Sequence, residues 1–112
     1  MSSMSFAEQD GRVWVAWETD GQVWFTRADQ PSTPVAAPGP AGRRKHPRLA
    51  FDSTGRMLLA WTSVPGWAKP GELGWALYQP SGKLEATGGG EATPVWSFAT
   101  PVAGADGFAL LV

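Results

Sequence analysis

Carboxylates at turns are the first residues in this chain whose types could do chemistry. Four aspartates stand at glycine-containing turns: Asp10, Asp20, Asp52 and Asp106. A glycosidase needs two carboxylates roughly 5–9 Å apart across one cleft, whereas a turn aspartate bonds nearby backbone N–H groups. The turn role is favoured for all four. Glu18, at the end of an apolar run, is a candidate to face a groove, but one carboxylate makes no catalytic pair.

Histidine and basic residues offer little further chemistry. His46 is the only histidine and the chain has no cysteine, so neither a His/Cys metal site nor a Ser-His-Asp arrangement can be assembled. A packing role is favoured for His46, with general acid–base work as the alternative. The basic run Arg43, Arg44, Lys45 and His46 is expected to be a solvated loop, with an anion contact as the alternative. No cofactor is expected.

Aromatic residues provide the remaining candidates for binding. Five of the seven tryptophans are expected to pack on strands: Trp14, Trp17, Trp24, Trp61 and Trp75. Trp67 lies instead in a loop with Lys69, where its ring could stack on a sugar or fold back over a sheet end. The predicted ligand-binding residues are therefore Trp67, Lys69, Glu18 and His46.

Composition excludes several classes of partner. The net charge is −1 and no long block of like charge exists, so nucleic acid is not expected. No apolar run approaches the roughly 18 residues that span a membrane. Residues 1–5 lack the apolar region of a signal peptide. The ordered pattern begins abruptly at Phe6, which indicates a piece cut from a longer parent.

A repeat sets the elements that must position these residues. Gly11, Gly55 and Gly107 are 44 and 52 residues apart, and each is followed by an apolar run. Trp17 and Trp61 each lie six residues after their glycine. This period is typical of one four-stranded propeller blade. Runs that are apolar on both faces predict strands buried between neighbouring sheets.

The repeat predicts an all-β fold of ten strands in one domain, residues 1–112. They form about two and a half four-stranded antiparallel blades of a β-propeller. The blades are expected at 5–37 and 46–90, with a half blade at 94–112. Within them, the expected strands are 5–8, 13–17, 23–27, 33–36, 48–51, 56–62, 73–78, 83–87, 95–102 and 108–112. Asp20-Gly21 is a hairpin signal, because both residues tolerate left-handed backbone.

Residues 46–62 carry a family resemblance. A His46-Pro47 opening, an Asp52-x-x-Gly55 turn and an apolar strand ending in Trp61 resemble the repeat of sialidase-like (Asp-box or neuraminidase-repeat) propellers. Residues 13–27 resemble the same repeat, and 94–96 with 106–108 are similar to the C-terminal end of bacterial secreted members. The resemblance implies a secreted or periplasmic parent, although the chain itself leaves localisation open.

The same resemblance argues against catalysis. The Asp-box proper reads Ser-x-Asp-x-Gly-x-x-Trp, and the hairpins at 28–32 and 79–82 depart from it. Sialidases also use three arginines, a tyrosine with a glutamate partner and an acid/base aspartate. The only tyrosine, Tyr78, is expected on a third strand away from the central funnel. None of the catalytic set maps onto this chain.

Three functions remain open. The first is a non-catalytic propeller module that binds a glycan or a protein. The second is a structural C-terminal part of a larger sialidase-like protein. The third is part of a glycoside hydrolase with catalytic residues elsewhere. Two and a half blades leave open sheet faces and edges, so we expect the chain to self-associate, or a partner chain to complete the propeller as a ring.

Overall fold

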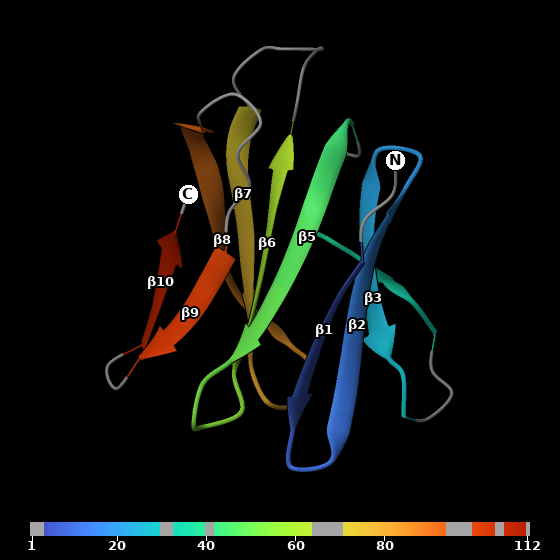
Figure 1. Ribbon diagram of the computed structural model, residues 1–112, viewed down its shortest axis with the longest axis vertical. Helices are drawn as coiled ribbons and strands as arrows, with labels where there is room; N and C mark the ends of the chain where they lie inside the picture. Colours follow the sequence, from blue (N-terminus) through green and yellow to red (C-terminus); the bar gives the residue numbers. More distant parts are fainter. Residues whose placement is uncertain are drawn as a thin grey trace.

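The protein is all-β, as its sequence predicts. The computed structural model describes residues 4–29, 33–39, 42–63, 71–93, 100–104 and 107–111, and leaves out the side chains of 91–93 and 111. These residues form ten strands and no helix, arranged as three antiparallel sheets (Figure 1). The expected and observed strands correspond one to one, although most bounds differ by a few residues.

The first sheet is a meander of four strands. It runs β1 (Met4–Gln9), β2 (Arg12–Thr19), β3 (Gln22–Arg27) and β4 (Val35–Ala36), with neighbours in chain order. Asp10-Gly11 and Asp20-Gly21 connect the first three strands as two-residue turns. Asp20 has φ 53° and Gly21 has φ 75°. These left-handed values match the twist of an antiparallel hairpin and confirm the predicted turn.

The second sheet repeats this order with longer strands. It runs β5 (Arg44–Phe51), β6 (Met57–Ser63), β7 (Gly71–Tyr78) and β8 (Leu84–Thr93). A bulge interrupts β5 between Lys45 and Arg48, and His46 within it has φ 54°. The basic run is therefore not a solvated loop. Arg44 and Lys45 belong to a strand, and Arg44 is buried.

A two-stranded hairpin forms the third sheet. It contains β9 (Thr100–Gly104) and β10 (Gly107–Leu111). Part of the strand expected at 95–102 falls on residues 95–99, which lie outside the described residues. The described part of the chain thus contains two sheets of four strands followed by a sheet of two.

The core lies between the first and second sheets. Its buried members are Ala16, Val23, Phe25, Ala37, Leu49, Met57, Leu59, Trp61, Ala76 and Tyr78, with Trp14 packed against them. A smaller cluster joins Ala60 and Leu73 of the second sheet to Leu110 of the third. Strand β6 therefore contributes to apolar contacts on both of its faces, as its run of apolar residues predicts.

Two of the five strand tryptophans belong to neither of these two clusters. Trp17 and Trp24 face each other across β2 and β3, in the same row as Met4. Side chains alternate along a strand, so this row lies on the opposite face from Trp14. Both rings are only half-buried. Apolar strand residues were expected to pack between sheets, but here no described sheet covers this face.

Candidate functional site

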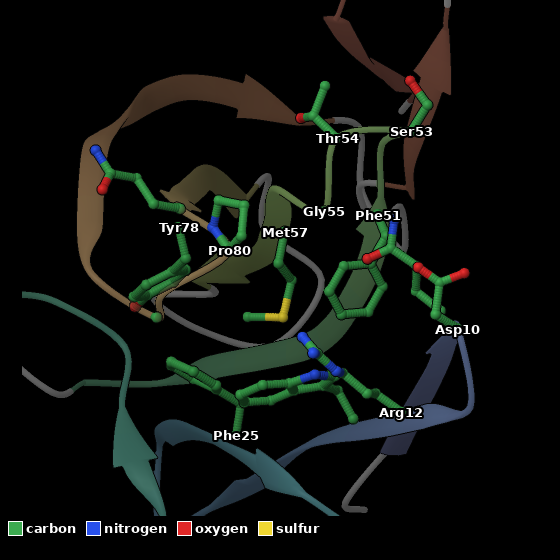
Figure 2. Close-up of a pocket in the computed structure, with 14 residues that line it drawn as sticks. Asp10, Arg12, Phe25, Phe51, Ser53, Thr54, Gly55, Met57, Tyr78 and Pro80 are labelled. Carbon is green, nitrogen blue, oxygen red and sulfur yellow. The ribbon is translucent and has the colours of Figure 1, made fainter.

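A pocket opens between the first and second sheets, at one end of their strands. The turns from β1 to β2, from β5 to β6 and from β7 to β8 all gather at this end (Figure 1). The pocket has a volume of about 170 Å³. Figure 2 shows its residues approaching from both sheets. No residue of this pocket was predicted as a binding residue from the sequence.

Aromatic side chains form the walls of the pocket. Trp14 and Phe25 come from the first sheet, while Phe51, Met57 and Tyr78 come from the second. The ring centroids of Trp14 and Phe51 are 6.5 Å apart, and those of Phe25 and Tyr78 are 4.8 Å apart. Tilted aromatic pairs at these separations are favourable. They hold the two sheets together and leave part of the Trp14 and Phe51 surfaces at the pocket.

Burial changes the acidity of the pocket tyrosine. It raises the pKa of Tyr78 to about 12, against a smaller opposite effect of the Arg44 charge. The Tyr78 hydroxyl is therefore a poor proton donor or nucleophile at neutral pH. The structure confirms that Tyr78 lies on the third strand of its sheet.

Polar residues line the rim. Asp10 lies in the first turn, and Arg12, which directly follows this turn, is exposed. None of the described carboxylates forms an ion pair with Arg12. Gln9 Nε2 donates a 2.6 Å hydrogen bond to the carbonyl oxygen of Asp52, which ties the first turn to the turn between β5 and β6.

Asp52 organises the turn beside the pocket. Its Oδ1 accepts hydrogen bonds from the backbone N–H of Thr54 and of Arg56, both at 2.9 Å. Its Oδ2 accepts one at 2.8 Å from Arg56 Nε. Burial would raise the pKa of Asp52, but the hydrogen bond from the Thr54 hydroxyl, at 2.7 Å, together with the bonds from Arg56 and from the two backbone N–H groups, outweighs it and lowers the pKa to about 2. The predicted turn role is confirmed for Asp52.

For the other predicted turn aspartates, the turn role is seen in the backbone conformation. Asp10 and Asp20 occupy their turns with left-handed backbone, at φ 52° and 53°. Asp106 lies outside the described residues. Because Asp52 is fully engaged by donors and remains ionised, it is unsuited to act as a general acid.

Arg44 is a buried cation that joins the two sheets. Its guanidinium donates to the Gln22 side chain at 2.9 Å and to the Pro38 carbonyl at 2.6 Å, and it lies 4.8 Å from the Trp61 ring centroid. Burial lowers the pKa of Arg44. Neutral acceptors and an aromatic face thus replace a carboxylate partner among the described residues, which makes Arg44 a structural group.

Two predicted ligand-binding residues come together at the opposite end of the sheets. Glu18 lies near the end of β2 and His46 near the start of β5. Burial and the charges of Arg48 and Lys45 lower the pKa of His46, while the nearby charge of Glu18 opposes them. Trp67 and Lys69 fall outside the described residues. Glu18 and His46 are therefore near each other but do not line the pocket.

The described residues contain no group of three or more His, Cys, Asp or Glu side chains placed to hold a metal ion. Among the same residues, there is also no helix that is long and apolar enough to cross a membrane.

Comparison with known proteins gives no relative. No family model, no curated protein and no solved structure matches this chain. The resemblance to sialidase-like propellers consequently stays a prediction, and the contacts described above carry the functional argument.

Proposed function

We propose that the chain is a non-catalytic propeller-type module that works by binding a second copy of itself through the open face of its first sheet. The open face consists of the outward-facing residues of β1 to β3, which include Met4, Phe6, Trp17 and Trp24. The observation that carries the proposal is the exposure of Phe6 at 63% when its counterpart in the second sheet, Leu49, is exposed at only 8%.

Strand register defines these counterparts. Phe6 pairs across β1 and β2 with Val15, which lies four residues after the repeat glycine Gly11. Leu49 pairs across β5 and β6 with Leu59, which likewise lies four residues after its repeat glycine, Gly55. Leu49 and Leu59 belong to the core that faces the first sheet. The open face of the first sheet is thus the repeat equivalent of a face that is already covered by a sheet.

The position of the first strands supports a propeller-type arrangement. Strands β1, β5 and β9 each begin a sheet, and β5 packs against β1 and against β9 (Figure 1). Successive sheets in a propeller are related in this way around a central axis. If the packing of the second sheet against the first is repeated once more, another sheet lies against the open face.

The third sheet supplies a suitable surface for that step. Val102 is exposed at 43% and Ala109 is also exposed. The strands β9 and β10 contain no charged residue, so their surface can be covered without desolvating a charge of the third sheet. Contact between the third sheet of one copy and the first sheet of the next is head-to-tail, and it closes as a ring when the rotation allows.

Light scattering on a sizing column tests the proposal. We expect a mass of two or more chains at micromolar concentration, and the mass of one chain for both Phe6→Glu and Val102→Glu. Leu84→Glu is the matched control, because Leu84 is an exposed apolar residue on neither docking face. A wild-type monomer at every concentration would refute self-association, as would equal effects of all three variants.

Glycan binding through Trp67 and Lys69 stays a prediction, because both residues lie outside the described residues. A structural part of a larger sialidase-like protein is an alternative that uses the same open face with a preceding sheet as the occupant. Catalysis gains no support from the described carboxylates, since Asp52 is engaged in its turn.

A further inference from the structure

We infer that the pocket between the first and second sheets binds a small molecule that combines one apolar ring with a single carboxylate. This inference does not depend on self-association, because the pocket lies between two sheets of the same chain and shares no residue with the open face. Three features support it: the size of the pocket, the chemistry of its walls, and Arg12, which forms no ion pair with a described carboxylate.

The size of the pocket limits the ligand to one ring. Its volume of about 170 Å³ is below the roughly 300–1,000 Å³ that is usual for sites of drug-sized ligands. Phe25, Met57 and Tyr78 are nearly fully buried and form the closed side of the pocket. Trp14 and Phe51 are only partly buried, so their rings retain surface for a ligand to cover.

The walls favour an apolar ring. Trp14 and Phe51 lie with their planes 54° apart, which forms a corner that an edge or face of another ring can enter. Aromatic side chains gain from such offset or edge-to-face contacts beyond the area that they bury. A hydroxyl placed directly against the Trp14 and Phe51 rings would lose its hydrogen bonds to water, because these rings offer no acceptor or donor of comparable strength.

Arg12 supplies the charge that selects a carboxylate. Figure 2 shows its side chain reaching from β2 toward the middle of the pocket. The other cation of this region, Arg56, is already paired with Asp52 and Glu85, whereas no described carboxylate pairs with Arg12. A guanidinium binds a carboxylate through two parallel hydrogen bonds. Asp10 at the same rim disfavours a second negative charge on the ligand.

An NMR titration with benzoate tests the inference. Benzoate is expected to shift the Trp14 indole N–H and the Arg12 side-chain N–H with a dissociation constant near or below the millimolar range. Benzamide has the same ring without the charge, and glucuronate has the charge on a hydroxylated ring. Each is expected to bind at least tenfold more weakly. Equal binding of either compound would overturn the part of the inference that it tests.

Variants locate the site. R12Q is expected to weaken benzoate binding about tenfold or more, since a charge-assisted hydrogen bond contributes about 1.5–3 kcal/mol. Arg43→Gln is the matched control, because Arg43 is an exposed arginine outside the pocket. Trp14→Phe keeps an apolar wall and is expected to retain part of the affinity. The absence of any shift at these residues, or equal loss in R12Q and Arg43→Gln, would overturn the inference.

Benzoate binding and self-association can be tested separately. Phe6→Glu changes the open face and leaves the pocket intact, so it is expected to bind benzoate with unchanged affinity as a monomer. If benzoate binding instead disappears together with self-association, the ligand site requires the oligomer and the pocket within one chain is not the site.

Discussion

The two four-stranded sheets of this protein share one plan but differ in what covers them. Both are meanders with neighbours in chain order, and a tryptophan stands at the same place in each second strand, Trp17 in the first and Trp61 in the second. Trp61 is buried in the core, whereas Trp17 is half-buried on the open face. Equivalent residues therefore have different environments because a sheet is present on one face and not on the other.

The residue paired with each tryptophan on the neighbouring strand also differs between the covered and the open face. Trp61 faces Gly74 across β6 and β7, and a methyl group added to Gly74 would lie 2.3 Å from Trp61 Nε1. Trp17 faces Trp24 in the first sheet. The missing side chain at Gly74 lets the Trp61 ring lie close against the backbone and leaves room for the covering sheet. At the open face, two large rings stand side by side instead.

The largest expected contrast is between Leu49 and Phe6. Leu49→Ala removes a buried side chain between the sheets and should lower the free energy of unfolding by about 3 kcal/mol. Phe6→Ala alters an exposed side chain and should cost about 0.5 kcal/mol in the monomer. Urea denaturation measures the free energies of unfolding of both variants, at a protein concentration where light scattering shows single chains. Similar losses for the two variants would mean that the open face is covered within the monomer.

The second contrast is between Gly74 and Trp24. Gly74→Ala forces the Trp61 ring to move inside a packed core and should cost about 2–3 kcal/mol, near the upper end for overpacking. Trp24→Ala removes a half-buried ring from the open face and should cost about 1 kcal/mol in the monomer. Thermal or urea unfolding of the two variants measures the difference. A larger loss for Trp24→Ala would show that the open face contributes more than the core.

Local patterns predict the strands well, because each apolar run and each turn is a short-range signal. The hairpin at Asp20-Gly21 and the turn at Asp52 needed only the residues within them. The pocket could not be found in this way. Its walls join Trp14 to Phe51, residues that are 37 positions apart and come from different sheets, and no motif in the chain encodes that contact.

Arg44 shows the same limit. Its neighbours Arg43 and Lys45 made a solvated loop the natural expectation for this run. Burial of Arg44 depends on the Pro38 carbonyl and on the Trp61 ring, which reach it only when the two sheets pack. The sequence shows that such a residue is charged, but the hydrogen-bond acceptors that allow its burial are brought near it only by the tertiary structure.

The smallest contrast is between two turn aspartates. Asp52→Asn keeps an acceptor for the backbone but removes the negative charge that faces Arg56, so it should lower the free energy of unfolding by about 1–2 kcal/mol at pH 7. Asp20→Asn should change it by less than about 0.5 kcal/mol, because the position needs left-handed backbone, at φ 53°, and asparagine tolerates that conformation.

The pH dependence of the Asp52 contribution separates charge from turn geometry. The pKa of Asp52 is about 2 in the folded protein and 3.8 as its ordinary value. Its stabilisation is therefore complete above about pH 4 and is lost as the pH falls from 3.8 toward 2, because the unfolded chain takes up the proton first. Urea unfolding of the wild type and Asp52→Asn between pH 2 and 7 should show the gap between them closing in this window. A gap that persists at pH 2 would assign the stabilisation to the shape of the turn, and the second sheet would then use its aspartate as the first sheet does.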